Sequence, residues 1–183
     1  HQRPLHLQGR LPDAGPRGCC PPRNQKDCVA RFSLYHALKT VDYRGAERVV
    51  RINGLDTPYW REDIRACVAG GCDSIRIPKT EHAEDVHRVA AAIAEDEKTY
   101  GRPEGEVLII AALESARGVM NALEICESDE RLFGIALSGG DYTKDLQTHI
   151  TATGIELMVA RQRDDRLPPA PQVCSASTPS IPT

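Results

Sequence analysis

The sequence predicts an α/β chain built on a parallel sheet, and three observations support this fold class. Apolar, strand-like segments alternate with amphipathic, helix-like segments through the middle of the chain. Each apolar segment stops at a polar or charged residue, and the segment 107–113 is apolar on both faces. Such alternation is typical of βα units, and strands that are apolar on both faces belong to parallel sheets covered by helices. The pattern is compatible with an open doubly wound sheet or with part of a (β/α) barrel.

The first half of the pattern predicts a helix at about 27–39, a strand at 47–52 and a second helix. Thr57 can cap this second helix and Pro58 can occupy its first turn, where a missing N–H costs nothing. The Gly70-Gly71 pair is suited to end it. Its apolar side chains, spaced three and four residues apart, share one face: Trp60, Ile64, Cys67 and Val68.

The second half begins with a strand at 73–78 and a long helix for which Thr80 is the expected cap. The spacing of three and four residues on this helix is the strongest helical signal in the chain. The residues that repeat are Val86, Val89, Ala90, Ile93 and Ala94. A strand at 107–113, a helix at about 116–126, a strand at 133–137 and a final short helix complete the order.

Both ends of the chain differ in composition from this middle part. Most of the 13 prolines lie in residues 1–24 and 163–183, which show no apolar periodicity. Such segments bury too little apolar surface to offset the entropy of ordering. We therefore expect an irregular head at 1–24, a single folded domain at 25–162 and an irregular Pro/Ser-rich tail at 163–183.

Composition also excludes several classes of protein. The net charge of −3 gives no indication of a nucleic-acid or membrane-surface partner. The longest apolar run, 107–113, is far shorter than the roughly 18 residues that a membrane helix requires. Seven cysteines match no zinc-binding spacing, so we expect reduced, structural thiols and a cytoplasmic protein.

The candidate chemistry lies at two successive strand ends. Glu114 follows the strand at 107–113, and Asp141 follows the strand at 133–137 after two glycines that allow a ligand close approach. Parallel strands place their carboxyl ends at one edge of the sheet, so the two carboxylates form a candidate Mg²⁺ site. Either residue could instead be an acid that caps the following helix.

Two basic residues also follow or end strands. Arg51 is the charged residue within the apolar run 49–52, where an arginine usually answers a protein or ligand anion. Lys79 follows Pro78 at the end of the next strand and could reach a carboxylate or phosphate, or be a solvated loop lysine.

Four segments, VVRINGLDTP, DSIRIPKTE, IIAALESARGVMNALEI and LFGIALSGGDYTKDL, resemble in order and spacing the citrate lyase beta subunit branch of the HpcH/HpaI aldolase and citrate lyase family. The resemblance covers about residues 25–162. It implies a (β/α)₈ barrel of the phosphoenolpyruvate/pyruvate type, here incomplete with about four core strands. It also implies Mg²⁺-dependent cleavage of a citryl thioester, of coenzyme A or an acyl carrier protein, to oxaloacetate and an acetyl thioester.

The same resemblance implies roles for individual residues. Glu114 and Asp141 match the metal ligands, and Arg51 matches a catalytic arginine that meets substrate oxygen. Arg51, Lys79, Ser138 and Gly139 are the expected substrate-binding residues. The family further implies a homo-oligomer and citrate lyase alpha and gamma subunits as partners, with neither nucleic acid nor membrane.

Alternative functions are a malyl- or methylmalyl-CoA lyase and a non-catalytic remnant that retains the metal site. Two departures from the family pattern motivate the second alternative. Gly140 stands where the family usually has glutamate, and residues outside the matching range do not resemble the family's first and last strands. We interpret these ends as a truncation or a loss of reading frame.

Overall fold

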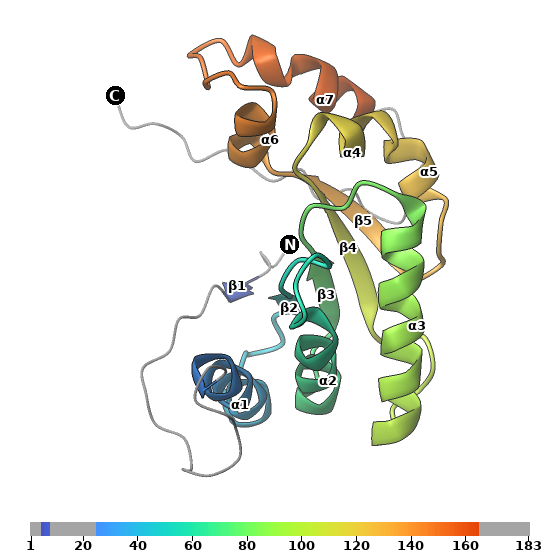
Figure 1. Cartoon of the computed structure of the whole chain (residues 1–183). Coiled ribbons are helices and arrows are strands. Elements are labelled where there is room, and N and C mark those ends of the chain that lie inside the picture. Colours follow the sequence, from blue (N-terminus) through green and yellow to red (C-terminus); the bar gives the residue numbers. More distant parts are fainter. Residues whose placement is uncertain (1–4, 8–24, 165–183) are drawn as a thin grey trace. The chain divides into compact units, whose positions relative to one another are not determined.

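The structure, a computed structural model, describes residues 5–7 and 25–164 (Figure 1). Its strands follow the order β1-β2-β3-β4-β5 in a five-stranded sheet. The pairs β1–β2 and β4–β5 are parallel. The predicted fold class, an α/β chain with parallel strands, is thereby confirmed.

The chain forms two compact units. The first comprises His1–Ile75 and Ala92–Val107, and the second comprises Arg76–Ala91 and Leu108–Thr183. The first contains β1 (Leu5–Leu7), α1 (Gln25–Thr40), β2 (Arg48–Arg51), α2 (Trp60–Gly70), the start of β3 (Ser74–Ile77) and the end of α3 (Ala83–Tyr100). The second contains the rest of β3 and α3, β4 (Leu108–Leu113), α4 (Ala116–Met120), α5 (Ala122–Cys126), β5 (Leu132–Leu137), α6 (Gly139–Asp145), the 3₁₀ helix η1 (Ile155–Leu157) and α7 (Met158–Asp164).

The strand β1 lies within the segment 1–24, which composition predicted to be irregular, and it adds to the four predicted strands, β2–β5. Leu5, His6 and Leu7 pair in parallel register with Arg48, Val49 and Val50. Backbone pairing with the free edge of β2 can order a three-residue segment even where composition gives no periodic signal. The rest of the head and the tail beyond residue 164 lie outside the described residues.

Helix α2 begins later than predicted. Thr57 closes a turn instead, because its N–H and its hydroxyl both donate to the carbonyl of Gly54, at 3.0 and 2.7 Å. The helix starts at Trp60, and it ends as predicted at Gly71, which has φ +89° and donates its N–H to the carbonyls of Cys67 and Val68. A residue with a side chain would be strained in this left-handed conformation.

Helix α3 also starts after its predicted cap. The Thr80 N–H continues the sheet by donating to the Ala112 carbonyl at 3.0 Å. The carboxylate of Asp85 accepts the N–H groups of Glu81 and His82 instead, at 3.0 and 3.1 Å. The periodicity located the helix correctly, but an acid inside its first turn took the capping role.

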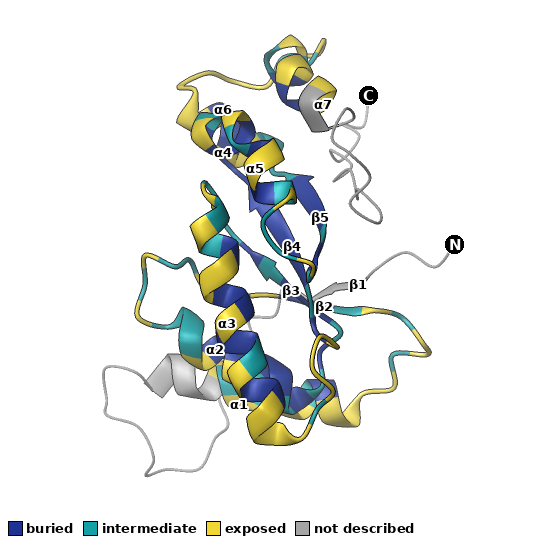
Figure 2. Cartoon of the chain, turned by 90° about the vertical axis from the view of Figure 1, so that its right-hand side faces the viewer, coloured by how far each residue is buried: buried dark blue, intermediate teal, exposed yellow. Residues whose placement is uncertain are grey.

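The strand β4 is the most completely buried element of the second unit, as its composition predicted. Residues 109–113 are all buried, and Figure 2 shows β4 and much of β5 in the buried colour. The predicted helix after it is split at Asn121 into α4 and α5. Asn121 has φ −92° and ψ 8°, outside the helical region, and its side-chain amide donates to the Glu81 carbonyl at 2.8 Å.

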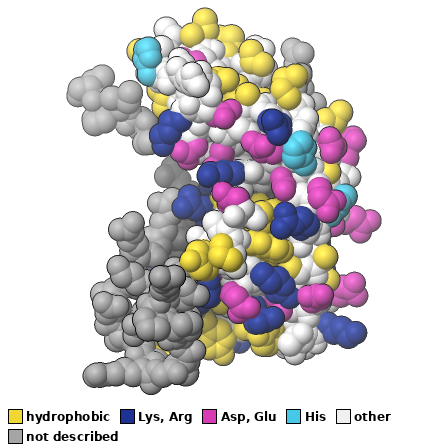
Figure 3. Space-filling model, viewed as in Figure 1, with side chains coloured by type: hydrophobic (Ala, Val, Ile, Leu, Met, Phe, Trp, Pro, Cys, Tyr) yellow, Lys and Arg dark blue, Asp and Glu magenta, His cyan; other side chains and the backbone are white. Residues whose placement is uncertain are grey.

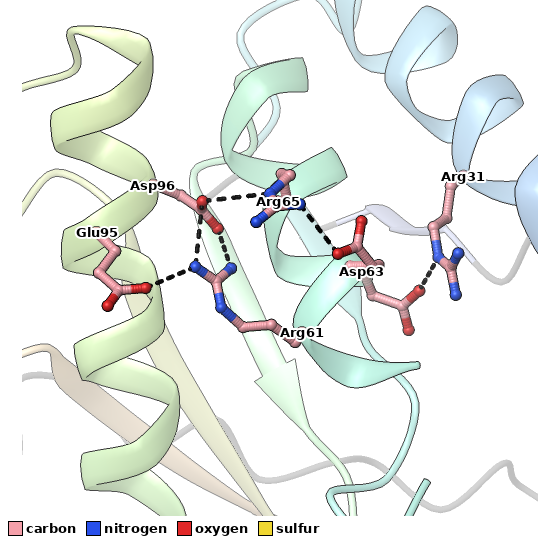
Figure 4. A network of polar contacts seen from close by, with 7 residues as sticks. Arg31, Arg61, Asp63, Arg65, Glu95 and Asp96 are labelled. Atoms are coloured by element: carbon pink, nitrogen blue, oxygen red, sulfur yellow. Dashed lines mark hydrogen bonds and ion pairs between the residues drawn. The ribbon is translucent and has the colours of Figure 1, made fainter. Parts of the chain in front are cut away.

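In the first unit, ion pairs join α2 to its neighbours (Figure 4). The guanidinium of Arg61 contacts both Asp96, whose side chain is 3% exposed, and Glu95. On the other side of α2, the buried Asp63 accepts from Arg31 at 2.8 Å and from the backbone and side chain of Asn53. Each buried carboxylate therefore has a cationic or amide partner, which offsets its desolvation.

The buried thiols of this unit are structural, as the sequence predicted. Cys67 and Cys72 are both completely buried. Hydrogen bonding to Cys72 and burial raise the pKa of the Cys67 thiol well above its ordinary value. Such a thiol is a poor nucleophile.

Among the helices of the described ranges, none has the length and apolarity to cross a membrane.

A two-point ion pair fixes the start of β2. Asp73 accepts the backbone N–H of Arg48 at 2.7 Å and its guanidinium at 2.6 and 3.0 Å. Partial burial alone would raise the pKa of Asp73, but the hydrogen bonds and the charge of Arg48 outweigh it and hold this pKa below its ordinary value. The folded protein therefore binds this proton less readily than the unfolded chain.

Replacing Asp73 by Asn is expected to lower the free energy of unfolding at pH 7 by about 1 kcal/mol, a small value because the pair is partly exposed. The contribution of Asp73 is complete above its unfolded pKa of about 3.9 and is lost as the pH falls through the lower folded pKa. Urea unfolding at pH 7, 4 and 3 should show the two proteins converging in acid. The control is Glu104→Gln, an exposed carboxylate of the same unit; a constant difference at all three pH values would contradict the assignment.

Candidate metal site at the strand ends

Glu114 lies directly after β4, in the link to α4. It is 8% exposed, although a carboxylate is costly to bury without a counter-charge or donors. Ser115, rather than Glu114, caps α4, because the Ser115 hydroxyl accepts the Gly118 N–H at 3.2 Å. The alternative in which Glu114 is the side chain that caps the next helix is therefore not the observed arrangement.

Asp141 lies in the first turn of α6, directly after β5, and its carboxylate is exposed. The ammonium of Lys144 donates to it at 2.8 Å, and the hydroxyl of Ser138 at 3.3 Å. The hydrogen bond to Asp141, its charge and the charge of Glu114 all raise the pKa of Lys144. The positive charge of Lys144 therefore contacts Asp141 and also interacts electrostatically with Glu114.

The links that carry these two carboxylates are joined by one backbone hydrogen bond and one backbone-to-side-chain hydrogen bond. The Ser138 N–H donates to the Leu113 carbonyl at 2.9 Å, so the pairing of β4 with β5 continues past the end of β5. The Ala116 N–H donates to the carboxylate of Asp145 in α6 at 2.7 Å. The structure thus brings the surroundings of Glu114 and Asp141 together at one edge, as the parallel strands predicted.

The link after β3 joins the same edge. Thr80 is buried and pairs with Ala112, and Glu81 accepts the Ser115 hydroxyl at 2.6 Å. Lys79 is exposed and has φ +50°, a left-handed conformation that is uncommon for a residue with a side chain. Its side chain is thus presented to solvent, and its predicted role in substrate binding stays a prediction.

Arg51 is the last residue of β2 and is exposed. It belongs to the first compact unit, whereas Lys79, Glu114, Ser138, Gly139 and Asp141 belong to the second. Its role beside the two carboxylates therefore stays a prediction. The first unit has a cleft of about 500 Å³, which is lined by residues 41–48, at and before the start of β2, and by Asp73. None of the predicted site residues lines this cleft.

Sequence reasoning did not single out three residues that contact this edge: Glu81, Lys144 and Asp145. Lys144 carries a readable signal, since it lies three residues after Asp141 and so shares its helix face. Glu81 and Asp145 act on residues 34 and 29 positions away. No local pattern reports such contacts.

The donor set suits a hard cation. Carboxylate, hydroxyl and carbonyl oxygens gather at this edge, and Mg²⁺ takes one or two protein carboxylates with water and substrate oxygens as its other ligands. Within the described ranges, no three His, Cys, Asp or Glu side chains form a closed cluster. On the face shown in Figure 3, acidic and basic side chains are interspersed.

Comparison with known proteins gives concordant matches. The model of the HpcH/HpaI aldolase/citrate lyase family matches residues 20–166. Citrate lyase subunit beta of Leuconostoc mesenteroides subsp. cremoris is 52% identical over 132 residues, which are 72% of this chain and 44% of that protein. The L-malyl-CoA/beta-methylmalyl-CoA lyase of Cereibacter sphaeroides is 34% identical, over 68% of this chain and 40% of that protein. The chain thus spans less than half the length of these curated relatives.

Solved structures agree with these matches. The citrate lyase beta subunit from M. tuberculosis, complexed with oxaloacetate and magnesium, is 27% identical with a TM-score of 0.55, over 78% of this chain and 56% of that chain. RipC from Yersinia pestis, at 23% identity and a TM-score of 0.58 over 80% of this chain and 59% of that chain, shows the fold alone. The predicted barrel type agrees with the match to the M. tuberculosis structure.

Two glycines at this edge give a matched pair of substitutions. A Cβ on Gly118 would lie 2.5 Å from the Thr80 carbonyl oxygen, whereas a Cβ on Gly140 would have no atom within 4 Å. Gly118→Ala must therefore force α4 away from the link after β3, at a cost of about 1–3 kcal/mol. Gly140→Ala should be neutral or stabilising by up to about 1 kcal/mol.

Thermal unfolding of the two alanine variants checks this prediction. We expect a clearly lower Tm for Gly118→Ala and an unchanged or higher Tm for Gly140→Ala. Equal Tm values for the two variants would show that α4 does not approach Thr80 as closely as described.

Proposed function

Because this chain belongs to the HpcH/HpaI aldolase/citrate lyase family, as its strand-end motifs predicted, we propose that it acts as a carbon–carbon lyase of the citrate lyase beta subunit type. Its substrate is a citryl thioester, and its products are oxaloacetate and an acetyl thioester. The observation that carries the proposal is the joined pair of strand-end links bearing Glu114 and Asp141. These links lie in a segment that is similar to citrate lyase subunit beta.

Mg²⁺ is the proposed cofactor, with Glu114 and Asp141 as its protein ligands. Support comes from the oxygen donors at this edge and from the magnesium in the related M. tuberculosis structure. The bound ion would supply a Lewis acid for the substrate's hydroxyl or keto oxygen.

The remaining site residues are proposed to bind the substrate and to neutralise its charge. In the cleavage, the substrate hydroxyl gives its proton to water, the carbon–carbon bond breaks, and the electron pair of that bond passes to the thioester as an enolate, which takes a proton back from water. Arg51 is proposed to neutralise charge on the substrate oxygens. Ser138, whose hydroxyl donates to Asp141, and Gly139 are proposed to bind the substrate, and the exposed Lys79 is proposed to meet a substrate carboxylate.

The carrier of the thioester is coenzyme A or an acyl carrier protein. By analogy with the relatives named subunit beta, we propose that the working form is an oligomer that includes alpha and gamma subunits, in the cytoplasm. The related malyl-CoA lyases make malyl and methylmalyl thioesters the alternative substrates. A non-catalytic protein that retains only the metal site is the third outcome.

Removing either proposed ligand should weaken Mg²⁺ binding without unfolding the chain. Asp141→Asn and Glu114→Gln keep the size of each side chain but remove a charge that a hard cation requires. Isothermal titration with MgCl₂ should show binding by the natural chain and a loss of at least about tenfold in affinity for each variant.

The control for this titration is Asp129→Asn. Asp129 lies on the loop before β5, and among its described contacts its carboxylate accepts only the nearby Arg131 N–H.

Oxaloacetate formed from citryl-CoA, reported by malate dehydrogenase, tests the reaction, with (3S)-malyl-CoA as the competing substrate. Unchanged activity in Asp141→Asn would sink the metal assignment. Mg²⁺ binding without activity on either thioester would favour the non-catalytic alternative.

Arg51→Lys keeps the charge at the end of β2 but removes the planar, two-pronged donor. If Arg51 meets charge that develops on oxygen, kcat should fall by about 10²-fold or more with little change in KM or in Mg²⁺ affinity. Steady-state kinetics with citryl-CoA decide this. A rise in KM alone would assign Arg51 to ground-state binding.

A further inference from the structure

Two carboxylates that are not proposed metal ligands bind the two residues immediately after Glu114, one through a side-chain hydroxyl and one through a backbone N–H. Ser115 is bound by Glu81 from the link after β3, and Ala116 is bound by Asp145 from α6. Glu114 therefore lies between a fixed strand end, Leu113, and two residues that are each tied to another element. The candidate metal site thus has an outer set of contacts as well as its ligands.

The contact of Asp145 also orients α6. Asp141 and Asp145 lie four residues apart in this helix, so their side chains share one face. Because Asp145 accepts the Ala116 N–H at 2.7 Å, this face is turned toward the link that carries Glu114. The bond is short. It joins the two elements that supply the proposed ligands.

The contact of Glu81 orients the other residue. A serine hydroxyl has one hydrogen to donate, and the Ser115 hydroxyl donates it in a hydrogen bond to the Glu81 carboxylate at 2.6 Å. The lone pairs of the same oxygen remain for the Gly118 N–H at the start of α4. Asn121 further fixes Glu81 by donating to its carbonyl at 2.8 Å. These bonds fix the rotamer of Ser115 and tie the residue after Glu114 to the link after β3.

We propose that Asp145 is a positioning residue for the metal site, assisted by Glu81, and that its hydrogen bond to Ala116 sets the spacing between Glu114 and Asp141. This inference rests on the proposed function, since it presupposes that Glu114 and Asp141 bind Mg²⁺. Asp145 acts through the Ala116 N–H and not by contact with the ion. Its effect therefore depends on an acceptor oxygen more than on its charge.

Three variants of the full chain separate these roles. Asp145→Ala removes the acceptor and the charge, whereas Asp145→Asn removes the charge but keeps an acceptor oxygen. Asp129→Ala is the matched control, because it deletes an aspartate that also accepts a backbone N–H, from Arg131 at 2.9 Å, at the opposite end of β5. Mg²⁺ affinity is measured by isothermal titration, and exchange of the Ala116 amide is measured by NMR without metal.

We expect Asp145→Ala to weaken Mg²⁺ binding by about tenfold, the usual effect of losing a residue that orients a ligand, and to speed Ala116 exchange. Asp145→Asn should retain most of both properties, and Asp129→Ala should match the natural chain. Equal losses in Asp145→Asn and Asp145→Ala, or no loss in either, would overturn the inference. A folded natural chain that binds no Mg²⁺ would overturn the proposed function and this inference with it.

Discussion

The candidate site depends on the continuation of parallel pairing beyond the strands themselves. The Ser138 N–H reaches back to the Leu113 carbonyl, and the Thr80 N–H reaches the Ala112 carbonyl. These bonds align the links after β3, β4 and β5 at one edge of the second unit. Glu114 and Asp141 each lie within three residues of an aligned position, so backbone pairing brings the links that carry them to one edge before any side chain is considered.

Burial and charge then distinguish the two carboxylates. Glu114 is almost covered and stands at the end of a strand with no exposed residue, whereas Asp141 is open to solvent beside Gly140. A buried and an exposed oxygen donor at one edge suit a cation that is held by the protein on one side and by water or substrate on the other. Lys144 supplies the positive charge near both, which makes it a natural competitor of a bound ion.

Much of this arrangement could be predicted from the sequence. The apolar run before Glu114 and the Gly139-Gly140 pair before Asp141 located both strand ends, because buried parallel strands and close-approach glycines have local signatures. Helix starts were predicted less well, since Thr57 and Thr80 formed bonds to Gly54 and Ala112 that no local pattern reports. Strand β1 was missed because a three-residue strand carries too little periodicity to be recognised.

The central claim is that Glu114 and Asp141 bind one metal ion together, and paramagnetic broadening by Mn²⁺ tests it most directly. Substoichiometric MnCl₂ added to the ¹⁵N-labelled chain should broaden the amide signals of Ser115 and Tyr142 together, while those of Asp129 and Arg131, in the loop before β5 at the opposite end of that strand, stay sharp. Broadening at only one of the two links, or at neither, would contradict a shared site.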